Sequence, residues 1–153
     1  MSGPALVVGI GNRSRGDDGV GPEVAARVAG LDLPGVTVMV CEEPLALVEH
    51  VNGYDEVVVV DAVHSGGDAG QVQVWLVGAE PLPRQGHAIG SHGLGVGDAV
   101  ELARALGRLP HRLTLVGVEA ETFLLGAPLS AEVRDHLDAA VRAVTDALTA
   151  RKR

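Results

Sequence analysis

The chain has 153 residues, of which 46% are hydrophobic and only 2% aromatic, and its formal net charge is −8 at pH 7. This length favours a single domain over residues 1–153. The negative charge argues against a nucleic-acid surface, which needs a basic face. The one cysteine, Cys41, excludes an intramolecular disulfide and a cysteine-based zinc site.

No apolar run reaches the ~20 residues of a membrane span, and the N-terminus lacks a signal-like segment. We therefore expect a soluble cytoplasmic protein that binds neither nucleic acid nor membrane.

The first element is an apolar run over 5–10 that predicts a buried strand. It ends at Gly11, and the polar loop that follows carries Asp17 and Asp18 before a helix predicted over 20–30. In open α/β sheets, ligands gather at the carboxyl ends of the strands. Two neighbouring carboxylates at such a strand end are the first indication of a functional site.

The run at 56–62 is the strongest strand signal, because it holds four consecutive valines. A run without alternation indicates burial on both faces, as in a central parallel strand. Asp61 closes this run, so it should fall at the same sheet edge as the loop at 11–19. The alternating segment 71–77 predicts a half-exposed edge strand. The segment 78–92 is rich in Gly and Pro and predicts a long functional loop.

The other predicted elements complete an alternating pattern. They are a strand at 36–40, a helix at 44–53, a helix at 94–106, a strand at 112–118 and a last helix capped by Ser130. This order of strands and helices predicts an α/β fold in which helices flank a mostly parallel sheet.

Three polar residues stand at the ends of otherwise apolar elements: Asp18, Asp61 and His92. If the first and third strands are parallel neighbours, the two aspartates converge, and His92 could fold over the same edge. Two carboxylates and an imidazole suit a borderline divalent metal such as nickel, zinc or cobalt. Three protein ligands would leave positions open for water or substrate.

Each of these residues also has a simpler interpretation. Asp18 could be a helix cap or a first-turn acid stabilised by the helix dipole. Asp61 follows buried valines, so it needs a partner whatever its role. His92 could be a loop histidine bonded to backbone, and Asp17 could support the site or be solvated.

Two other kinds of chemistry have weak signals. Gly9-x-Gly11 after a strand is half of a dinucleotide fingerprint, but Ser14 stands at the third position and the two aspartates of the turn would repel a pyrophosphate. No G-x-S-x-G pattern surrounds Ser65 or Ser91, so serine catalysis has little support.

Five segments of the chain form an ordered set of motifs. They are V-G-I-G-N-x-x-x-x-D-D-G-V-G at 8–21, V-V-V-V-D-A at 57–62, S-H-G-L-G at 91–95, L-V-G-V-E at 115–119 and P-L-S-x-E-V at 128–133. This set resembles the hydrogenase maturation proteases, the endopeptidases that trim the large subunit of [NiFe] hydrogenases. The resemblance covers nearly the whole chain.

The resemblance implies a three-layer α/β/α fold with a five-stranded mixed sheet, in the order 2-1-3-5-4 with strand 4 antiparallel. It also implies that Asp18, Asp61 and His92 are the metal ligands and the catalytic residues. The metal would be nickel already installed in the immature large subunit, so it would arrive with the substrate. The enzyme would then remove a C-terminal peptide, with one aspartate able to act as general base. We expect a monomer.

Two segments depart from the family's pattern. Residues 41–44 read C-E-E-P where many relatives have a D-G-G-T-type segment, and residues 66–70 read G-G-D-A-G rather than G-x-x-P-G. Both should border the cleft, so the departures concern the partner more than the chemistry. Two alternatives stay open: a non-hydrolytic nickel-binding chaperone or sensor, and a nucleotide-binding domain.

Overall fold

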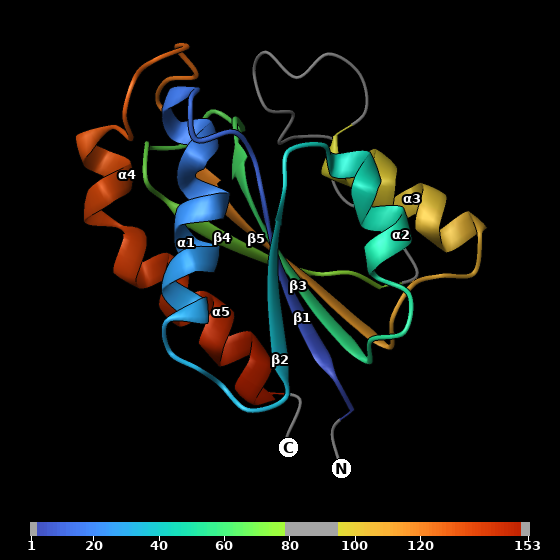
Figure 1. Ribbon diagram of the computed structural model, residues 1–153. Helices are drawn as coiled ribbons and strands as arrows, with labels where there is room; N and C mark the ends of the chain where they lie inside the picture. The colour runs from blue at the N-terminus through green and yellow to red at the C-terminus, as the bar shows by residue number, and fades with distance from the viewer. Residues whose placement is uncertain (1–2, 79–94, 151–153) are drawn as a thin grey trace.

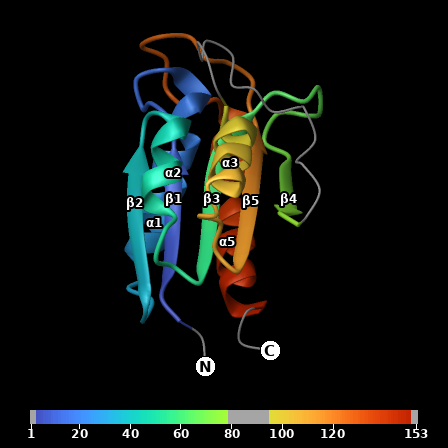
Figure 2. The ribbon, with the colours of Figure 1, turned by 90° about the vertical axis from the view of Figure 1, so that its right-hand side faces the viewer.

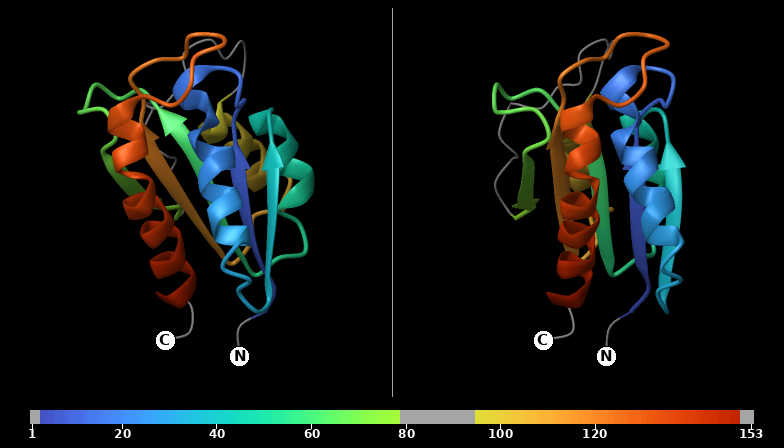
Figure 3. Two further views of the ribbon diagram at one scale, coloured as in Figure 1. Left: turned by 60° about the vertical axis from the view of Figure 1, so that its left-hand side comes forward. Right: turned by 90° about the vertical axis from the view of Figure 1, so that its left-hand side faces the viewer.

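The computed structural model describes residues 3–78 and 95–150. In this part of the chain, five strands form one sheet in the order β2-β1-β3-β5-β4 (Figure 1). They are β1 (Ala5–Ile10), β2 (Val36–Cys41), β3 (Glu56–Val63), β4 (Val72–Leu76) and β5 (Arg112–Glu119). All neighbours pair in parallel except β4, which runs antiparallel to β5 at the sheet edge (Figure 3). The predicted mixed sheet is confirmed.

Helices cover both faces of the sheet, as Figures 1 and 2 show. One layer contains α1 (Val20–Ala29), α4 (Ala131–Asp135) and α5 (Leu137–Ala150), and the other contains α2 (Leu47–His50) and α3 (Val96–Ala105). Short 3-10 turns, η1 (Gly16–Gly19) and η2 (Pro44–Ala46), precede α1 and α2. Among the described residues, no helix combines the length and apolar character needed to cross a membrane.

Alternate residues of the central strands divide the core into two halves. Val58 and Val60 pack in the cluster that contains the apolar residues of α1 and α5. Val57 and Val59 pack in the cluster that contains those of α2 and α3. Since successive side chains of a strand point to opposite faces, Asp61 belongs to the face covered by α2 and α3.

Helix α1 crosses β1 at unusually close range. A Cβ on Gly9 would lie 2.3 Å from the carbonyl oxygen of Gly21, and a Cβ on Gly21 would lie 2.3 Å from that of Ile10. Both positions therefore require glycine. This contact fixes the start of α1, and with it the loop that carries Asp18, against the end of β1.

The C-terminal helix is broken, which differs from the prediction of one continuous helix after Ser130. The hydroxyl of Ser130 accepts a bond from the N–H of Val133 at 3.4 Å, so the predicted cap is confirmed. At His136 the chain leaves helical geometry, because its N–H bonds to Val133 O while its Nδ1 lies 2.8 Å from Glu132 O. The side chain thus occupies the carbonyl that a continuous helix would use.

The two helices on the other face are shorter than predicted. The helix expected at 44–53 is divided into η2 and α2, and the helix expected from residue 94 begins at Val96. Gly95 caps α3, and its N–H donates to the Asp98 side chain at 3.1 Å. This bond gives the Gly95 N–H an acceptor in place of the carbonyl oxygen that a further helical turn would have provided.

Candidate active site

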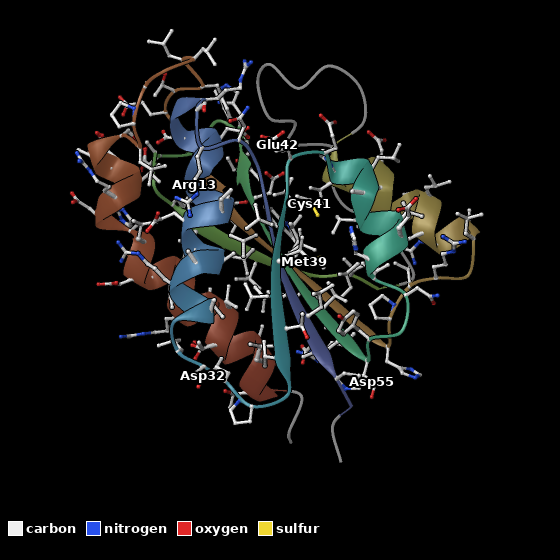
Figure 4. The ribbon with its side chains drawn as sticks, viewed as in Figure 1. Arg13, Asp32, Met39, Cys41, Glu42 and Asp55 are labelled. Atoms are coloured by element: carbon white, nitrogen blue, oxygen red, sulfur yellow. The ribbon has the colours of Figure 1, made fainter. Side chains whose placement is uncertain are left out.

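The loops that follow the parallel strands meet at one edge of the sheet, at the top of Figures 1 and 3. The loop at 11–19 leaves β1 with Asp17 and Asp18, and Asp61 lies near the end of β3. Gly9 on β1 pairs with Val60 on β3, so the two loops leave the sheet side by side. Glu42 follows β2 at the same edge (Figure 4).

Asp61 is a buried carboxyl without a full set of partners. It is 4% exposed, and its Oδ1 atom has no hydrogen-bond partner among the described residues. Burial, followed by the nearby negative charge of Asp18, raises the pKa of Asp61 well above its ordinary value. A buried oxygen in this condition favours a bound cation or a proton.

The chain's only tryptophan, Trp75, lies beside this carboxyl. Gly117 on β5 is the direct strand partner of Asp61, about 4.8 Å away. A Cβ on Gly117 would lie 2.8 Å from Cζ3 of Trp75 and 2.9 Å from Cγ1 of Val63. The indole ring therefore occupies the space of the missing side chain on Gly117, the strand partner of Asp61.

Trp75 was not among the predicted site residues, because the alternating segment that contains it predicts a half-exposed edge strand. The available signal was Gly117 itself. A glycine inside an otherwise apolar strand indicates that another group approaches closely.

Asp18 is held by its own loop. The N–H of Asn12 donates to Asp18 Oδ2 at 2.9 Å. The N-caps of η1 and α1 are Arg15 and Gly19, and neither makes a side-chain cap bond, so the interpretation of Asp18 as a helix cap is wrong. Burial raises the pKa of Asp18; the Asn12 bond and the charge of Arg15 oppose this shift, and Glu42 adds to it.

The neighbouring Asp17 has a structural role. It is fully buried, so the interpretation of Asp17 as a solvated residue is wrong. Its carboxylate accepts bonds from the N–H groups of Glu121 (2.8 Å), Thr122 (3.2 Å) and Ser130 (2.7 Å), and from the Ser130 hydroxyl (2.9 Å). These bonds fasten the loop at 121–130 to the loop that carries Asp18.

A further buried carboxylate braces the loop after β3. Glu119, at the end of β5, accepts bonds from the N–H of Ser65 at 2.9 Å and from its hydroxyl at 2.5 Å. The N–H of Gly70 donates to the Glu119 carbonyl oxygen at 2.7 Å. The loop at 64–70 is thereby tied to the neighbouring strand. Sequence reasoning missed Glu119, although it follows a buried strand just as Asp61 does.

His92, the third predicted site residue, lies outside the described residues. Within the described ranges, no group of three or more His, Cys, Asp or Glu side chains is arranged to hold one metal ion. What the structure brings together is the pair Asp18 and Asp61, whose charges interact. Two carboxylates, one with a buried oxygen that no described residue bonds, suit a divalent cation that brings further ligands with it.

Known proteins related to this chain include characterised members of one family. The family model of HycI, described as hydrogenase maturation protease, matches residues 42–147. The hydrogenase expression/formation protein HupD of Rhizobium leguminosarum bv. viciae is 32% identical over 149 residues, which cover 89% of this chain and 69% of that protein.

Solved structures agree with these matches. The crystal structure of the [NiFe] hydrogenase maturation protease HycI from Thermococcus kodakarensis matches with a TM-score of 0.73 and 27% identity, covering 95% of this chain and 92% of that one. The hydrogenase maturating endopeptidase HybD from E. coli shares the fold, with a TM-score of 0.75 and 24% identity over 97% of this chain and 93% of that one. The chain therefore belongs to the hydrogenase maturation protease family, as its motifs predicted.

Proposed function

We propose that this protein is the endopeptidase that recognises nickel in the immature large subunit of a [NiFe] hydrogenase and removes the subunit's C-terminal peptide. Family membership supports the peptidase activity and its role in hydrogenase maturation. The recognition of nickel rests on one observation, the pair of carboxylates at Asp18 and Asp61, in which one buried oxygen of Asp61 has no hydrogen-bond partner within residues 3–78 and 95–150.

Asp18, Asp61 and His92 are the ligands we propose for the nickel of the precursor. A cation shared by the two carboxylates would replace their mutual repulsion by attraction to both. Carboxylate and imidazole ligands suit a borderline divalent metal. Because no thiolate takes part, the site should bind nickel weakly when the precursor is absent, which suits a protein that inspects a metal held by its substrate.

Peptide hydrolysis also needs a proton acceptor for the attacking water and a proton donor for the leaving amine. The nickel of the substrate can polarise the scissile carbonyl or the water. Asp61 is our candidate for the acceptor, because burial and the charge of Asp18 raise its pKa, and a carboxylate with a raised pKa is a stronger base than an ordinary one. It takes the proton of the water as the new carbon–oxygen bond forms, and returns it to the nitrogen as the carbon–nitrogen bond breaks.

The test is cleavage of a nickel-loaded large-subunit precursor, followed by mass spectrometry of the released tail. We expect release with the loaded precursor, none with a nickel-free precursor, and none with Asp61→Asn or His92→Ala. Asp32→Asn is the matched control, since Asp32 lies at the far end of the molecule (Figure 4). Binding of the loaded precursor without release of a tail would contradict the proposal and favour the alternative of a nickel-binding chaperone or sensor.

A further inference from the structure

The loop at 121–130 lies at the end of the sheet where the parallel strands finish (Figure 1), and it presents two adjacent leucines to solvent. Leu124 is 68% exposed and Leu125 is 70% exposed, more than any other large hydrophobic side chain within the described residues. Single exposed apolar residues are common on protein surfaces, but an adjacent pair beside a catalytic edge is typical of an interaction surface.

The exposure of this pair is built into the loop. The Asp17 carboxylate binds both the start and the end of the segment. Three further bonds hold its middle: Gly126 N–H to Ser14 O at 2.6 Å, Gly16 N–H to Ala127 O at 3.0 Å and Leu124 N–H to the Thr122 hydroxyl at 3.1 Å. Phe123 already fills the place beneath the loop in the core. The two leucines therefore cannot turn inward without breaking this network.

The same bonds place the pair next to the site. Ser14 and Gly16, which bond to the middle of the loop, belong to the segment that runs directly into Asp18. Any folded protein whose chain is cut at Asp18 and Asp61 must lie against this edge. The leucine pair thus lies at the edge against which such a protein would be placed.

We propose that Leu124 and Leu125 are a docking surface for the folded body of the large-subunit precursor, which would offer an apolar patch beside its C-terminal tail. The inference rests on the proposed function, because it takes the precursor as the protein at this edge. The net charge of −8 disfavours a second copy of this chain as the occupant, since two such copies repel each other.

The experiment compares two double variants of the full chain. Leu124→Ser/Leu125→Ser removes the docking surface. Leu31→Ser/Leu106→Ser is the control, because these leucines are 49% and 53% exposed and follow the C-terminal ends of α1 and α3, away from the site edge. Both variants should keep a melting temperature close to that of the wild type, since about half or more of each of the four side chains is exposed. If the serine pair at 124 and 125 does not fold, glutamine at both positions takes its place.

Two measurements are made with the nickel-loaded precursor: the kinetics of tail release and the affinity of the complex before cleavage. For the variant at 124 and 125 we expect KM and Kd to rise about tenfold while kcat changes less than about twofold, because truncating an apolar anchor weakens binding without touching the reacting groups. The control should match the wild type.

The possible outcomes separate the two proposals. Unchanged KM and Kd would overturn the docking surface, and so would an equal loss in the control pair. A dimer that dissociates on serine substitution, with precursor affinity unchanged, would show that a second copy occupies the patch instead, and would also overturn it. If the wild type releases no tail, the proposed function fails, while the affinity measurement still decides whether the leucine pair binds the precursor.

Discussion

Asp17 and Asp61 are both buried, and both lie at the edge of the sheet where the parallel strands end. Asp17 accepts four hydrogen bonds from the loop at 121–130, whereas Asp61 has an oxygen with no partner in the described part of the chain. Burial alone therefore does not separate a structural carboxylate from a functional one. What separates them is whether the fold itself supplies the hydrogen-bond donors, since an unpartnered buried oxygen is stable only if something else binds it.

The largest effect should come from removing the well-bonded member of this comparison. Asp17→Ala leaves the three N–H groups that bond to this buried carboxylate, and the Ser130 hydroxyl, without their acceptor, so we expect the free energy of unfolding to fall by about 3–5 kcal/mol, measured by urea denaturation. Asp32→Asn is the control, because Asp32 is exposed and asparagine tolerates its positive φ of 51°, so stability should change by less than about 0.5 kcal/mol. A loss for Asp17→Ala as small as that of the control would remove the distinction between the two buried aspartates.

Asp61→Asn should reduce activity rather than stability. We expect tail release to fall at least about 100-fold, because the substitution removes the carboxylate that we propose as both metal ligand and proton acceptor. Stability near neutral pH should stay the same or increase, because an uncharged amide replaces a carboxylate that burial disfavours. Cleavage kinetics and urea denaturation of the same preparation test both parts. A variant that loses activity and stability together would show that Asp61 serves the fold.

The pH dependence of stability sharpens the comparison further. The folded-state pKa of Asp61 is raised, so the folded protein holds this proton more tightly than the unfolded chain. The resulting stabilisation is complete below the unfolded pKa of about 3.9 and is lost as pH rises through the folded pKa. For metal-free protein, the wild type should therefore lose stability relative to Asp61→Asn as the pH rises above about 4, by up to about 1.4 kcal/mol per pH unit. Parallel stability curves for the two proteins would contradict this prediction.

A smaller effect is expected at Glu119, whose carboxylate accepts hydrogen bonds from two groups of one residue, Ser65. Glu119→Gln weakens the bonds from the N–H and hydroxyl of Ser65, so we expect a loss of about 1–2 kcal/mol. Ser65→Ala removes only the hydroxyl and should cost about 1 kcal/mol. The double variant should lose less than the sum, because the two residues share one interaction. Strict additivity would show that this contact does not hold the loop.

The smallest expected signal is spectroscopic. Because Trp75 lies across Gly117 from Asp61, Ni²⁺ added to the free protein should partly and saturably quench the tryptophan fluorescence. Asp61→Asn should lose this quenching, while Asp32→Asn keeps it. Equal quenching in all three proteins would indicate that the metal binds elsewhere.

The strands were predictable because their signals are local. The consecutive valines of β3 and the apolar run of β1 show burial without any knowledge of their neighbours. Asp61 could be singled out for the same reason, since a carboxyl after four buried valines needs a partner in any fold.

Asp17 and Asp18 could not be distinguished in this way. The donors that occupy Asp17 lie 104 to 113 residues away in the sequence, so nothing near the D-D pair reveals which member is structural. The break in the last helix depends on a single side-chain bond at His136, which leaves the apolar periodicity intact. Trp75 reaches the site across an intervening strand, and only the folded sheet brings the two together.

The close contact between β1 and α1 at Gly9 and Gly21 limits how the sequence of the loop between them, residues 11–19, can vary. Sliding α1 along β1 by one residue would bring a methyl or larger group into the backbone, so both ends of the connection are anchored in one register. Between these anchors, residues 13–15 have exposed or half-exposed side chains, and Ser14 contributes to the loop network through its backbone. The backbone of the tip is therefore held between two fixed ends, so a substitution at Ser14 can change the surface of the loop while Asp18 keeps its place.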